Sequence, residues 1–511
     1  MRVLIFHGYL LSGTGSNVYN SELAAALVRA GHEVHLLCQD RDPLALDWVD
    51  AAGDWDAGEL RIHTRRDPAP ATVYRPDIHG LLPLYVADRY EGIEARPFPD
   101  LSEAEVDRYV DANVAAVREV AERVRPDVAL ANHLVMGPVI LNRALSGTPY
   151  AVKVHGSALE YTVKPHPRFL PYAVEGLAGA RGILVGSRHT GESLWAAIGD
   201  PSVEARTRLG PPGVDVARFA PREPDAARRG IEALERRLEA DDPSGGDASS
   251  FSRAAGEGAA ALATIAAGDR LVVFVGKLIG SKGVELLLAA WPLVLAREPR
   301  ARLLVVGFGA FRAGLEGMAR DLAGGDLDAV RALRSETGAE LPHLAAFLQV
   351  AGDDYREAAA GMTERIAWAG RLDHPELVDI LPAAEAMVVP STFPEAFGMV
   401  AAEAAACGAL PVVANHSGLA EVARTLGAAA PERARRWLTF DVGPGAVREL
   451  ADDLIAWLAA PADLRAATRA AIVEATREHY SWDGVARAVI AAARGELDRL
   501  PRPAPDIGSN G

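Results

Sequence analysis

The chain has 511 residues, a length that predicts at least two domains, each able to bury its own hydrophobic core. Its 69 acidic and 53 basic side chains give a formal net charge of −16. This balance argues against a general nucleic-acid-binding protein, because no excess of basic residues is available to neutralise phosphates. It does not exclude a locally positive pocket for one small anion.

The N-terminal residues MRVLIFHGYLL contain one basic residue and a short apolar run, so they predict a β-strand and not a signal peptide. No later run is long and apolar enough to span a bilayer. The two cysteines, Cys38 and Cys407, match neither a disulfide framework nor a Cys/His metal site. We therefore expect a cytoplasmic protein whose membrane contact is peripheral at most.

The first half of the chain alternates between strand and helix patterns. Residues 2–7 (RVLIFH) predict a buried strand, residues 16–31 an amphipathic helix ending at Gly31, and residues 32–39 a second strand. Further strand patterns, each followed by a helical pattern, occur at 127–132, 150–156 and 182–187. This alternation predicts a parallel sheet in a first domain at residues 1–210.

A change of composition separates this domain from a second one. Residues 211–268 predict a linker and a flexible insertion, since they include the Ala-, Arg- and Glu-rich stretch from 221 onward and the sequence DDPSGGDASS. New strand patterns follow at 270–278, 300–309, 365–372, 384–391 and 410–415. They predict a second domain at 269–480, with a helical insertion at 312–364. Residues 481–500 predict a helix that returns to the first domain, and residues 501–511 a disordered tail.

Two such series predict an α/β fold in which two doubly wound, Rossmann-like domains face each other across a cleft. In doubly wound sheets, ligands bind beyond the carboxyl ends of the strands, so the loops there are the candidate sites. The first loop, GYLLSGTGSNVY, places Gly13 and Gly15 before a helix start, which favours an anion. A tight structural turn explains these glycines equally well. His155, at the end of another strand, is a second candidate, although a lone histidine is more often structural.

The segment GKLIGSKG places Lys277 and Lys282 in a loop that leaves an apolar strand. Two ammonium groups near a helix start suit a diphosphate better than a neutral ligand. The alternative is a solvated basic loop, which the apolar flanks and the acidic composition disfavour.

The segment PEAFGMVAAEAAACGALPVV contains Glu395 before a helix start and Glu403 about one turn inside the helix. Free amides at a helix start can hold phosphate or sugar oxygens, and carboxylates accept hydrogen bonds from the adjacent hydroxyls of a sugar or a ribose. Each acid alone could equally cap the helix or lie on the surface. The nearby lysine loop weakens that interpretation.

The order of the Gly-rich first loop, HG, GKLIGSKG, GFG, GRL and the Glu-x7-Glu segment resembles glycosyltransferase family 4. The resemblance covers nearly the whole chain outside the two insertions. It implies a retaining enzyme of GT-B fold, with a nucleoside-diphosphate sugar as donor and a sugar, polyol or lipid-linked hydroxyl as acceptor.

The resemblance also implies residue roles. Lys277 and Lys282 would hold the donor diphosphate and stabilise the leaving group, although Lys277 replaces the usual arginine and so loses its bidentate fork. Glu395 would bind the transferred sugar, Glu403 the ribose, and His155 would face the anomeric centre. The implied donor site consists of Gly15, Lys277, Lys282, Gly307, Arg371, Leu372, Glu395, Phe397, Gly398, Met399, Val400 and Glu403. The implied acceptor contacts are Asn17 and His133, and the implied catalytic residues are His155, Glu395, Lys277 and Lys282.

If Glu395 binds sugar hydroxyls, no evident carboxylate nucleophile remains for double displacement. The resemblance therefore implies front-face return, in which the departing phosphate takes the acceptor proton. We expect no cofactor and no metal, because the lysines supply positive charge and the Asp-Leu-Asp at 326–328 falls in the helical insertion. A GT-B sugar phosphorylase and a non-catalytic carbohydrate-binding scaffold are the alternative functions. The sugar, the base, the acceptor and the oligomeric state stay open.

Overall fold

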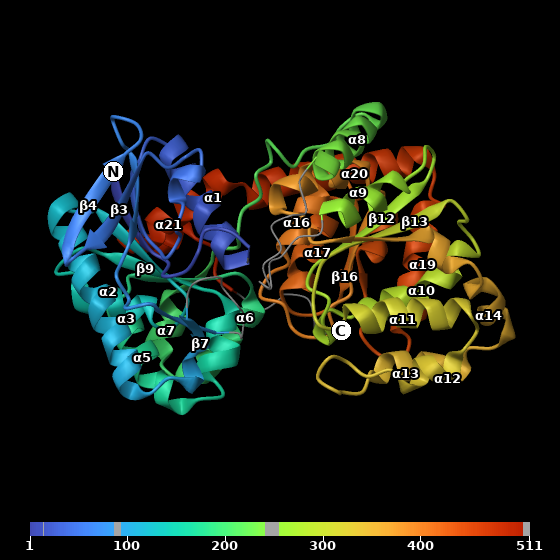
Figure 1. Ribbon diagram of the computed structural model, residues 1–511, viewed down its shortest axis with the longest axis horizontal. Helices are drawn as coiled ribbons and strands as arrows, with labels where there is room; N and C mark the ends of the chain where they lie inside the picture. The colour runs from blue at the N-terminus through green and yellow to red at the C-terminus, as the bar shows by residue number, and fades with distance from the viewer. Residues whose placement is uncertain (14, 86–93, 241–254, 504–511) are drawn as a thin grey trace. The chain divides into compact units, whose positions relative to one another are not determined.

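The chain forms two compact units in the computed structural model, which describes residues 1–13, 15–85, 94–240 and 255–503 (Figure 1). Unit 1 comprises Met1–Gly213 and Tyr480–Gly511, and unit 2 comprises Val214–His479. The chain therefore passes from one unit to the other at Gly213–Val214 and again at His479–Tyr480.

Unit 1 is built on a nine-stranded sheet with the strand order β11-β10-β9-β8-β1-β2-β5-β3-β4. Every pairing in it is parallel except that of β3 with β4. The strands are β1 (Arg2–Phe6), β2 (Glu33–Leu37), β3 (Ala51–Asp56), β4 (Glu59–Thr64), β5 (Ala71–Arg75), β8 (Val128–Asn132), β9 (Tyr150–Val154), β10 (Gly182–Val185) and β11 (Thr207–Leu209). A separate pair joins β6 (Leu81–Leu84) and β7 (Glu94–Pro97). The strand order reverses between β1 and β8, which defines the switch point of this sheet.

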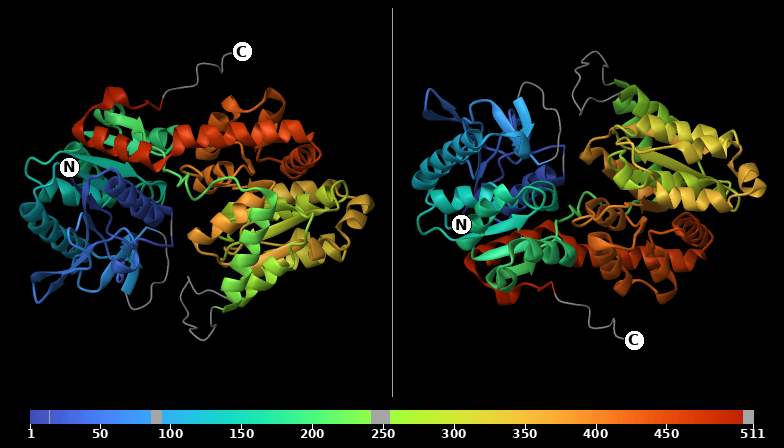
Figure 2. Two further views of the ribbon diagram at one scale, coloured as in Figure 1. Left: turned by 90° about the horizontal axis from the view of Figure 1, so that it is seen from above. Right: turned by 90° about the horizontal axis from the view of Figure 1, so that it is seen from below.

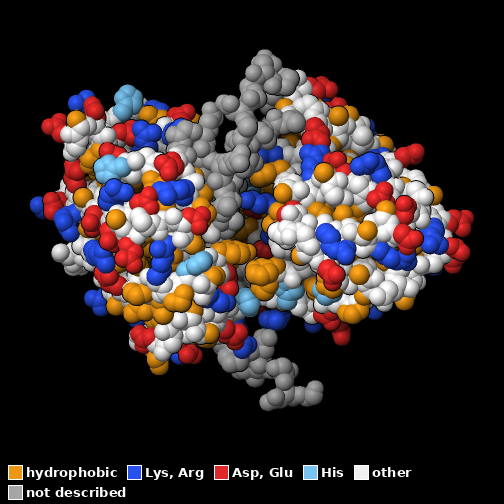
Figure 3. All heavy atoms as spheres, turned by 60° about the horizontal axis from the view of Figure 1, so that its bottom comes forward, with side chains coloured by type: hydrophobic (Ala, Val, Ile, Leu, Met, Phe, Trp, Pro, Cys, Tyr) orange, Lys and Arg blue, Asp and Glu red, His pale blue; other side chains and the backbone are white. Residues whose placement is uncertain are grey.

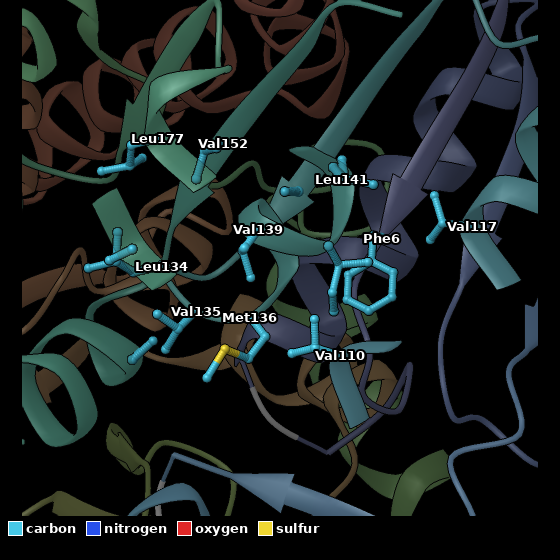
Figure 4. Close-up of a cluster of buried hydrophobic side chains, with 14 of the residues drawn as sticks. Phe6, Val110, Val117, Leu134, Val135, Met136, Val139, Leu141, Val152 and Leu177 are labelled. Carbon is cyan, nitrogen blue, oxygen red and sulfur yellow. The ribbon is translucent and has the colours of Figure 1, made fainter. Parts of the chain in front are cut away.

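Alternate residues of the buried strand β1 point to opposite faces of the sheet, and both faces are covered by helices. Leu4 and Phe6 belong to a cluster with side chains of α2 (Glu103–Val124), α3 (Gly137–Ala144) and α5 (Leu170–Ala178), part of which Figure 4 shows. Val3 and Ile5 pack instead with α1 (Gly15–Arg29) and α21 (Trp482–Arg494). A strand buried on both faces reads as a continuous apolar run, as RVLIF does, and only its ends are open to ligands.

The C-terminal segment belongs to unit 1. Helix α21 packs against α1, β8, β9 and β10, and Figures 1 and 2 show it in red beside this sheet. The carbonyl of Pro501 accepts a hydrogen bond from Leu209 at 2.8 Å, so the start of the expected tail is tied to β11. Residues 504–511 lie outside the described residues. The remaining helices of unit 1 are α4 (Gly156–Ala158), α6 (Arg188–Ile198) and α7 (Pro201–Arg206).

Unit 2 contains a six-stranded parallel sheet with the order β14-β13-β12-β15-β16-β17. Its strands are β12 (Arg270–Val275), β13 (Ala301–Val306), β14 (Ile366–Gly370), β15 (Ala386–Val389), β16 (Leu410–Ala414) and β17 (Thr439–Phe440). Numbered along the chain this is the order 3-2-1-4-5-6 of a dinucleotide-binding sheet, and its switch point lies between β12 and β15. The sequence predicted the first five strands and missed β17, which has only two residues.

The segment expected to be a flexible insertion contains two helices, α8 (Pro224–Ala240) and α9 (Ala255–Ala263). They pack against each other, and α9 packs against β14. The physical reason is an apolar stripe at helical spacing, because Ile231, Leu234 and Leu238 are buried along one face of an otherwise charged helix. The sequence DDPSGGDASS falls in 241–254, outside the described residues.

The expected helical insertion consists of α11 (Arg312–Ala323), α12 (Leu327–Ala332), α13 (Pro342–Val350) and α14 (Asp353–Ala359). The other helices of unit 2 are α10 (Val284–Leu295), α15 (Leu377–Ile380), α16 (Met399–Ala406), α17 (Ser417–Ala429), α18 (Glu432–Arg435), α19 (Ala446–Leu458) and α20 (Ala462–Tyr480). All but two residues of α10 are buried, and the helix packs against α19, α14 and α11, which fixes the loop that precedes it.

The surface agrees with the composition. Acidic and basic side chains are interspersed over both units on the face drawn in Figure 3. Cys38 and Cys407 are both buried free thiols. Within the described ranges, none of the helices has the length and apolarity that crossing a bilayer requires.

Candidate functional site

A lysine and a glutamate meet at the switch point of the unit 2 sheet. Lys282 ends the 3-10 turn Gly280–Lys282 after β12, and Glu395 lies in the loop after β15. The Lys282 ammonium donates a short hydrogen bond to Oε1 of Glu395, and the Ser391 hydroxyl donates to the same oxygen at 2.7 Å. Two residues 113 positions apart in sequence thus meet where ligands bind in such sheets.

The two loops that carry this pair are joined backbone to backbone. The amide of Thr392 donates to the carbonyl of Ser281 at 3.0 Å. Gly283 has φ +63°, and a Cβ there would lie 2.0 Å from the carbonyl oxygen of Pro390. Only glycine permits this approach, so GSKG is required for packing as well as for its charge. The Glu395 amide also donates to the Ser417 hydroxyl at 2.9 Å, which ties the loop to α17.

The environment keeps Glu395 ionised. Burial raises the pKa of its carboxyl, but the charge of Lys282 and the hydrogen bonds from Lys282 and Ser391 outweigh that effect, so the pKa lies below its ordinary value. The side chain nevertheless stays 23% exposed. It is therefore a charged acceptor within reach of a ligand.

Helix α16 begins directly after this loop. Its N-cap, Gly398, has φ +114°, and a Cβ there would lie 2.5 Å from Leu419. The first amides of the helix, at Met399 and Val400, have no acceptor within the helix, and both residues are half-buried. Phe397, by contrast, is buried. This helix start can hold an anionic or hydroxylated group, as a helix N-terminus commonly does.

Glu403 lies in the second turn of α16 and is 2% exposed. Its Oε1 accepts a hydrogen bond from Nε2 of His374 at 2.7 Å, and its Oε2 is buried without a partner. His374 follows β14, so this pair joins the loop after β14 to α16. The two acids of the Glu-x7-Glu segment therefore have different partners, Lys282 for Glu395 and His374 for Glu403.

The other predicted donor residues lie at the ends of β12, β13 and β14. Lys277 is half-buried in the loop after β12. A Cβ on Gly307 would lie 1.9 Å from the carbonyl oxygen of Gly276, so close loop packing already requires a glycine there. Arg371 donates to Asp373 at 2.9 Å, and Leu372 lies beside Gly258 of α9. Any contact of these residues with a ligand stays a prediction.

In unit 1, three histidines gather at the carboxyl ends of β1, β8 and β9. The His133 ring lies 5.7 Å from that of His7 and 4.8 Å from that of His155, measured between centroids. His155 Nε2 donates to Asn132 Oδ1 at 2.9 Å. His133 has φ +67° and is 2% exposed, and both of its ring nitrogens are buried without a hydrogen-bond partner.

Asn17 is hydrogen-bonded to the ring of His7. Asn17 is buried, and its amide donates to the carbonyl of Ser12 at 2.6 Å while its Oδ1 lies 3.0 Å from Nε2 of His7. Asn20 donates to Nδ1 of the same imidazole at 3.0 Å. These hydrogen bonds fix the His7 ring, and the acceptor contact predicted for Asn17 stays a prediction. Gly15 is the exposed first residue of α1.

All three histidines favour the neutral form. Burial lowers the pKa of His7 to about 4. Burial lowers the pKa of His133 well below its ordinary value, helped by His7, and does the same for His155, helped by His133. Protonating one of them would place a cation beside two other rings in a desolvated cluster. Near neutral pH they act as hydrogen-bonding groups, each with one donor and one acceptor nitrogen.

Lys153 on β9 lies near this cluster. It is 2% exposed, and its ammonium nitrogen donates to the carbonyl of Gly210 at 2.6 Å and lies 5.5 Å from the Tyr19 ring centroid. Burial lowers the pKa of Lys153 to about 7. Tyr19 in turn contacts the rings of His155 and Trp482 edge-on. The buried lysine therefore anchors the chain just before it leaves unit 1.

Acidic residues at the helical insertion serve the backbone and the surface. Asp326 caps α12 by accepting a hydrogen bond from Ala329 at 2.9 Å, and Asp328 pairs with Arg331. Among the described residues, no group of three or more His, Cys, Asp or Glu side chains is arranged to hold a metal ion.

The sequence did not indicate His7, Asn132, Ser391, His374 or His416. His416 is at the N-cap position of α17, and its Nε2 donates to the Ser391 carbonyl at 2.7 Å. A usable signal existed for four of them, because His7, Asn132, Ser391 and His416 each end or directly follow a predicted strand. His374 lies further into its loop, and only the fold brings it to Glu403.

Two family models match the chain. The model described as Glycosyltransferase Family 4 matches residues 13–218, and the model described as Glycosyl transferases group 1 matches residues 345–479. The first match contains the histidine cluster except His7, and the second contains Glu395, Glu403 and His374.

Among curated proteins, the chain is 32% identical over 233 residues to glycogen synthase of Mycobacterium tuberculosis (strain H37Rv), a match that covers 42% of this chain and 49% of that protein. The chain thus spans about half the length of the curated relative it matches.

Solved structures match over nearly the whole chain. Sucrose-phosphate synthase from Thermosynechococcus elongatus has a TM-score of 0.58 at 19% identity and covers 98% of this chain and 99% of its own. Anabaena HepE in complex with UDP and glucose has a TM-score of 0.56 at 15% identity and covers 97% and 100%. At these identities the likeness concerns the fold, and it confirms the predicted GT-B architecture. The two family models show that the chain belongs to the glycosyltransferases of family 4 and group 1 that they describe.

Proposed function

We propose that the protein is a retaining glycosyltransferase that moves a sugar from a nucleoside-diphosphate sugar to a hydroxyl acceptor. The observation that carries this proposal is the Lys282–Glu395 pair at the switch point between β12 and β15. A cation for a phosphate and an ionised acid for sugar hydroxyls stand side by side there, as a sugar diphosphate requires. Unit 2 would hold the donor and unit 1 the acceptor.

The donor would bind with its diphosphate at Lys277, Lys282 and the start of α16, and its ribose at Glu403. On binding, the diphosphate would replace Glu395 as the partner of the Lys282 ammonium. The sugar hydroxyls would then donate hydrogen bonds to the Glu395 carboxylate. HepE, which shares the fold, is described in complex with UDP and glucose, and this supports a nucleotide-sugar donor as the substrate class. Gly307, Arg371 and Leu372 would lie toward the base.

The proposed transfer is a front-face displacement. The bond from the anomeric carbon to the diphosphate oxygen breaks, a bond to the acceptor oxygen forms on the same face, and the acceptor proton passes to the departing phosphate. Lys277 and Lys282 stabilise the negative charge that develops on the leaving group. Glu395 is already engaged by Lys282 and Ser391, an arrangement that suits a hydroxyl-binding acid better than a nucleophile.

The acceptor would bind at the histidine cluster. Neutral imidazoles both donate to and accept from hydroxyl groups, and the unpartnered nitrogens of the buried His133 require such partners. His155, held by Asn132, would present its ring toward the anomeric centre. A sugar, a polyol and a lipid-linked hydroxyl all fit this chemistry. The cytoplasmic location expected from the sequence stays a prediction.

The test is a screen of several nucleoside-diphosphate sugars for slow hydrolysis without acceptor, repeated after exhaustive EDTA treatment. We expect release of a nucleoside diphosphate from one donor class, unchanged by EDTA because the lysines supply the positive charge. Phosphorolysis of a glycoside by inorganic phosphate, without nucleotide dependence, would indicate a phosphorylase. Sugar binding without any turnover would indicate a scaffold. Loss of activity on chelation, restored by magnesium or manganese, would overturn the role given to the lysines.

A further inference from the structure

Glu403 is a buried acid, and only one of its two carboxylate oxygens has a hydrogen-bond partner. Its Oε1 accepts from His374 at 2.7 Å, whereas Oε2 is buried without any hydrogen-bond partner. Buried polar atoms are nearly always hydrogen-bonded, so an orphaned carboxylate oxygen indicates a partner supplied from outside the protein. Because the oxygen of an ionised carboxylate only accepts, that partner must be a donor such as a hydroxyl.

Glu403 lies in the second turn of α16, so its carboxylate is close to the start of this helix. Helical side chains lean toward the N-terminus of their helix, so the carboxylate lies over the turn that contains Met399 and Val400. Both of these residues are half-buried and not sealed in the core. The Glu403 carboxylate therefore lies on the side where the proposed donor site begins.

His374 is itself held firmly. It starts the short turn His374–Glu376, which a capping box between Asp373 and Glu376 stabilises. Its ring lies 5.2 Å from the buried ring of Phe219, and its side chain is 25% exposed. An imidazole fixed by a cap and an aromatic neighbour limits the rotation of the carboxylate to which it donates.

We propose that His374 is a positioning residue that clamps Glu403 through Oε1, so that Oε2 is presented to a ribose hydroxyl and the protein selects ribonucleotides over deoxyribonucleotides. This inference rests on the proposed function, and it adds a residue outside the Glu-x7-Glu segment together with a selectivity. Without the clamp, the Glu403 carboxyl group is still present but loses the fixed geometry on which selectivity depends.

The experiment measures the affinity of UDP, GDP and ADP, and of their 2′-deoxy and 3′-deoxy counterparts, by calorimetry. For the base that binds, we expect the wild-type protein to prefer the ribonucleotide over at least one deoxy counterpart by about tenfold, or about 1.4 kcal/mol. We expect His374→Ala and His374→Phe to reduce this preference to about twofold. His374→Gln, which keeps a donor nitrogen in place, should retain most of it.

Three comparisons make the result decisive. His374→Phe keeps a ring beside Phe219, so it separates the lost hydrogen bond from lost packing. His35→Phe removes the similar His35–Glu33 pair, 3.0 Å long, on β2 of unit 1, and should leave the preference unchanged. The third comparison, between the affinities of the wild-type protein for a ribonucleotide and for its deoxy counterparts, requires no variant.

The outcomes also separate this inference from the proposed function. If no nucleoside diphosphate binds the wild-type protein, the proposed function fails. If nucleoside diphosphates bind but neither deoxy counterpart binds more weakly, the ribose contact of Glu403 and this inference both fail. If the preference persists in His374→Phe, the role of His374 alone is overturned.

Discussion

The carboxyl ends of the two central sheets carry opposite kinds of chemistry. Unit 1 gathers His7, His133 and His155, whose lowered pKa values keep them neutral. Unit 2 places an ionised pair, Lys282 and Glu395, at the same position of a similar sheet. One fold, used twice, thus carries a neutral histidine cluster in one unit and a lysine–glutamate pair in the other.

The lysines show the same contrast. The chain has only four lysines among its 53 basic residues, and two of them lie in the loop after β12. Lys153 of unit 1 is buried with a carbonyl and an aromatic ring as neighbours, and burial lowers its pKa to about 7. Lys282 of unit 2 instead faces a carboxylate. Burial without an acidic partner lowers the pKa of Lys153, whereas the Lys282 side chain is 29% exposed and paired with an acid.

Removing the acid of the ionised pair should have the largest effect. We expect Glu395→Ala to lower kcat by about 10²–10³, because a charge-assisted contact made mainly in the transition state is lost. Steady-state kinetics at saturating donor would measure it. Glu232→Ala, which removes a surface acid paired with Arg228 on α8, should leave kcat unchanged. Near-normal turnover in folded Glu395→Ala would refute the assignment.

Removing the cation should weaken binding of the nucleoside diphosphate product. We expect Lys282→Met to reduce this affinity by about 10–100-fold, the usual range for a hydrogen bond to a charged group, and addition of Lys277→Met to reduce it further. Titration calorimetry tests this, with Lys164→Met of unit 1 as the control. Equal affinity in the wild type and the double variant would show that the loop is a solvated basic surface and does not bind the diphosphate.

The same variant should change the pH dependence. Burial raises the pKa of Glu395 and Lys282 lowers it, so without Lys282 the pKa should rise. In Lys282→Met the acid-side loss of residual activity should therefore begin at higher pH than in the wild type. An unchanged acid limb would show that Glu395 does not control it.

Removing the second acid should act on binding more than on turnover. We expect Glu403→Gln to raise the donor KM by about tenfold while kcat changes little, because ribose contacts are similar in the ground and transition states. Gln keeps the volume of this buried side chain, and the unfolding midpoint would check the fold. A collapsed kcat with unchanged KM would show that the roles of the two glutamates are reversed.

The sequence predicted the parallel cores of both units because their strands are apolar on both faces and are separated by helical patterns. It did not predict β3, β4, β5, β11 or β17, which lie toward the edges and are short or mixed in polarity, or the separate pair of β6 and β7. Composition also misjudged α8, where charged residues surround an apolar stripe that becomes visible only at helical spacing.

At the site, linear motifs identified Lys282, Glu395, Glu403 and His155 but not the residues that hold them. The sequence did not indicate Ser391 and Asn132, because a serine or an asparagine at the end of a strand is too common to mark a functional site. The pairing of His374 with Glu403 joins positions 29 apart on different elements, so it depends on the order of β12 to β16. Roles that arise from tertiary pairing require the fold, whereas roles written into one loop do not.

The last prediction tests the neutral character of unit 1 through stability. The ordinary pKa of a lysine is 10.5, and burial lowers that of Lys153 to about 7. Between these values the unfolded chain binds a proton that the native chain does not, so raising the pH stabilises the native state by about 1.4 kcal/mol per pH unit. Lys153→Met has no amino group at this position, so its unfolded state does not bind this proton. We therefore expect the stability of the wild type relative to Lys153→Met to increase from pH 7 to pH 9, measured as the difference in unfolding midpoint by calorimetry.

Lys164→Met is the matched control, because Lys164 is 44% exposed and paired with Glu160 on the surface of the same unit. It should keep the wild-type dependence on pH, since its ammonium stays solvated in the native state. A difference between wild type and Lys153→Met that stays constant from pH 7 to pH 9 would mean that Lys153 is charged in the folded protein. Unit 1 would then hold a buried cation two residues before His155, and the contrast in charge between the two units would have to be abandoned.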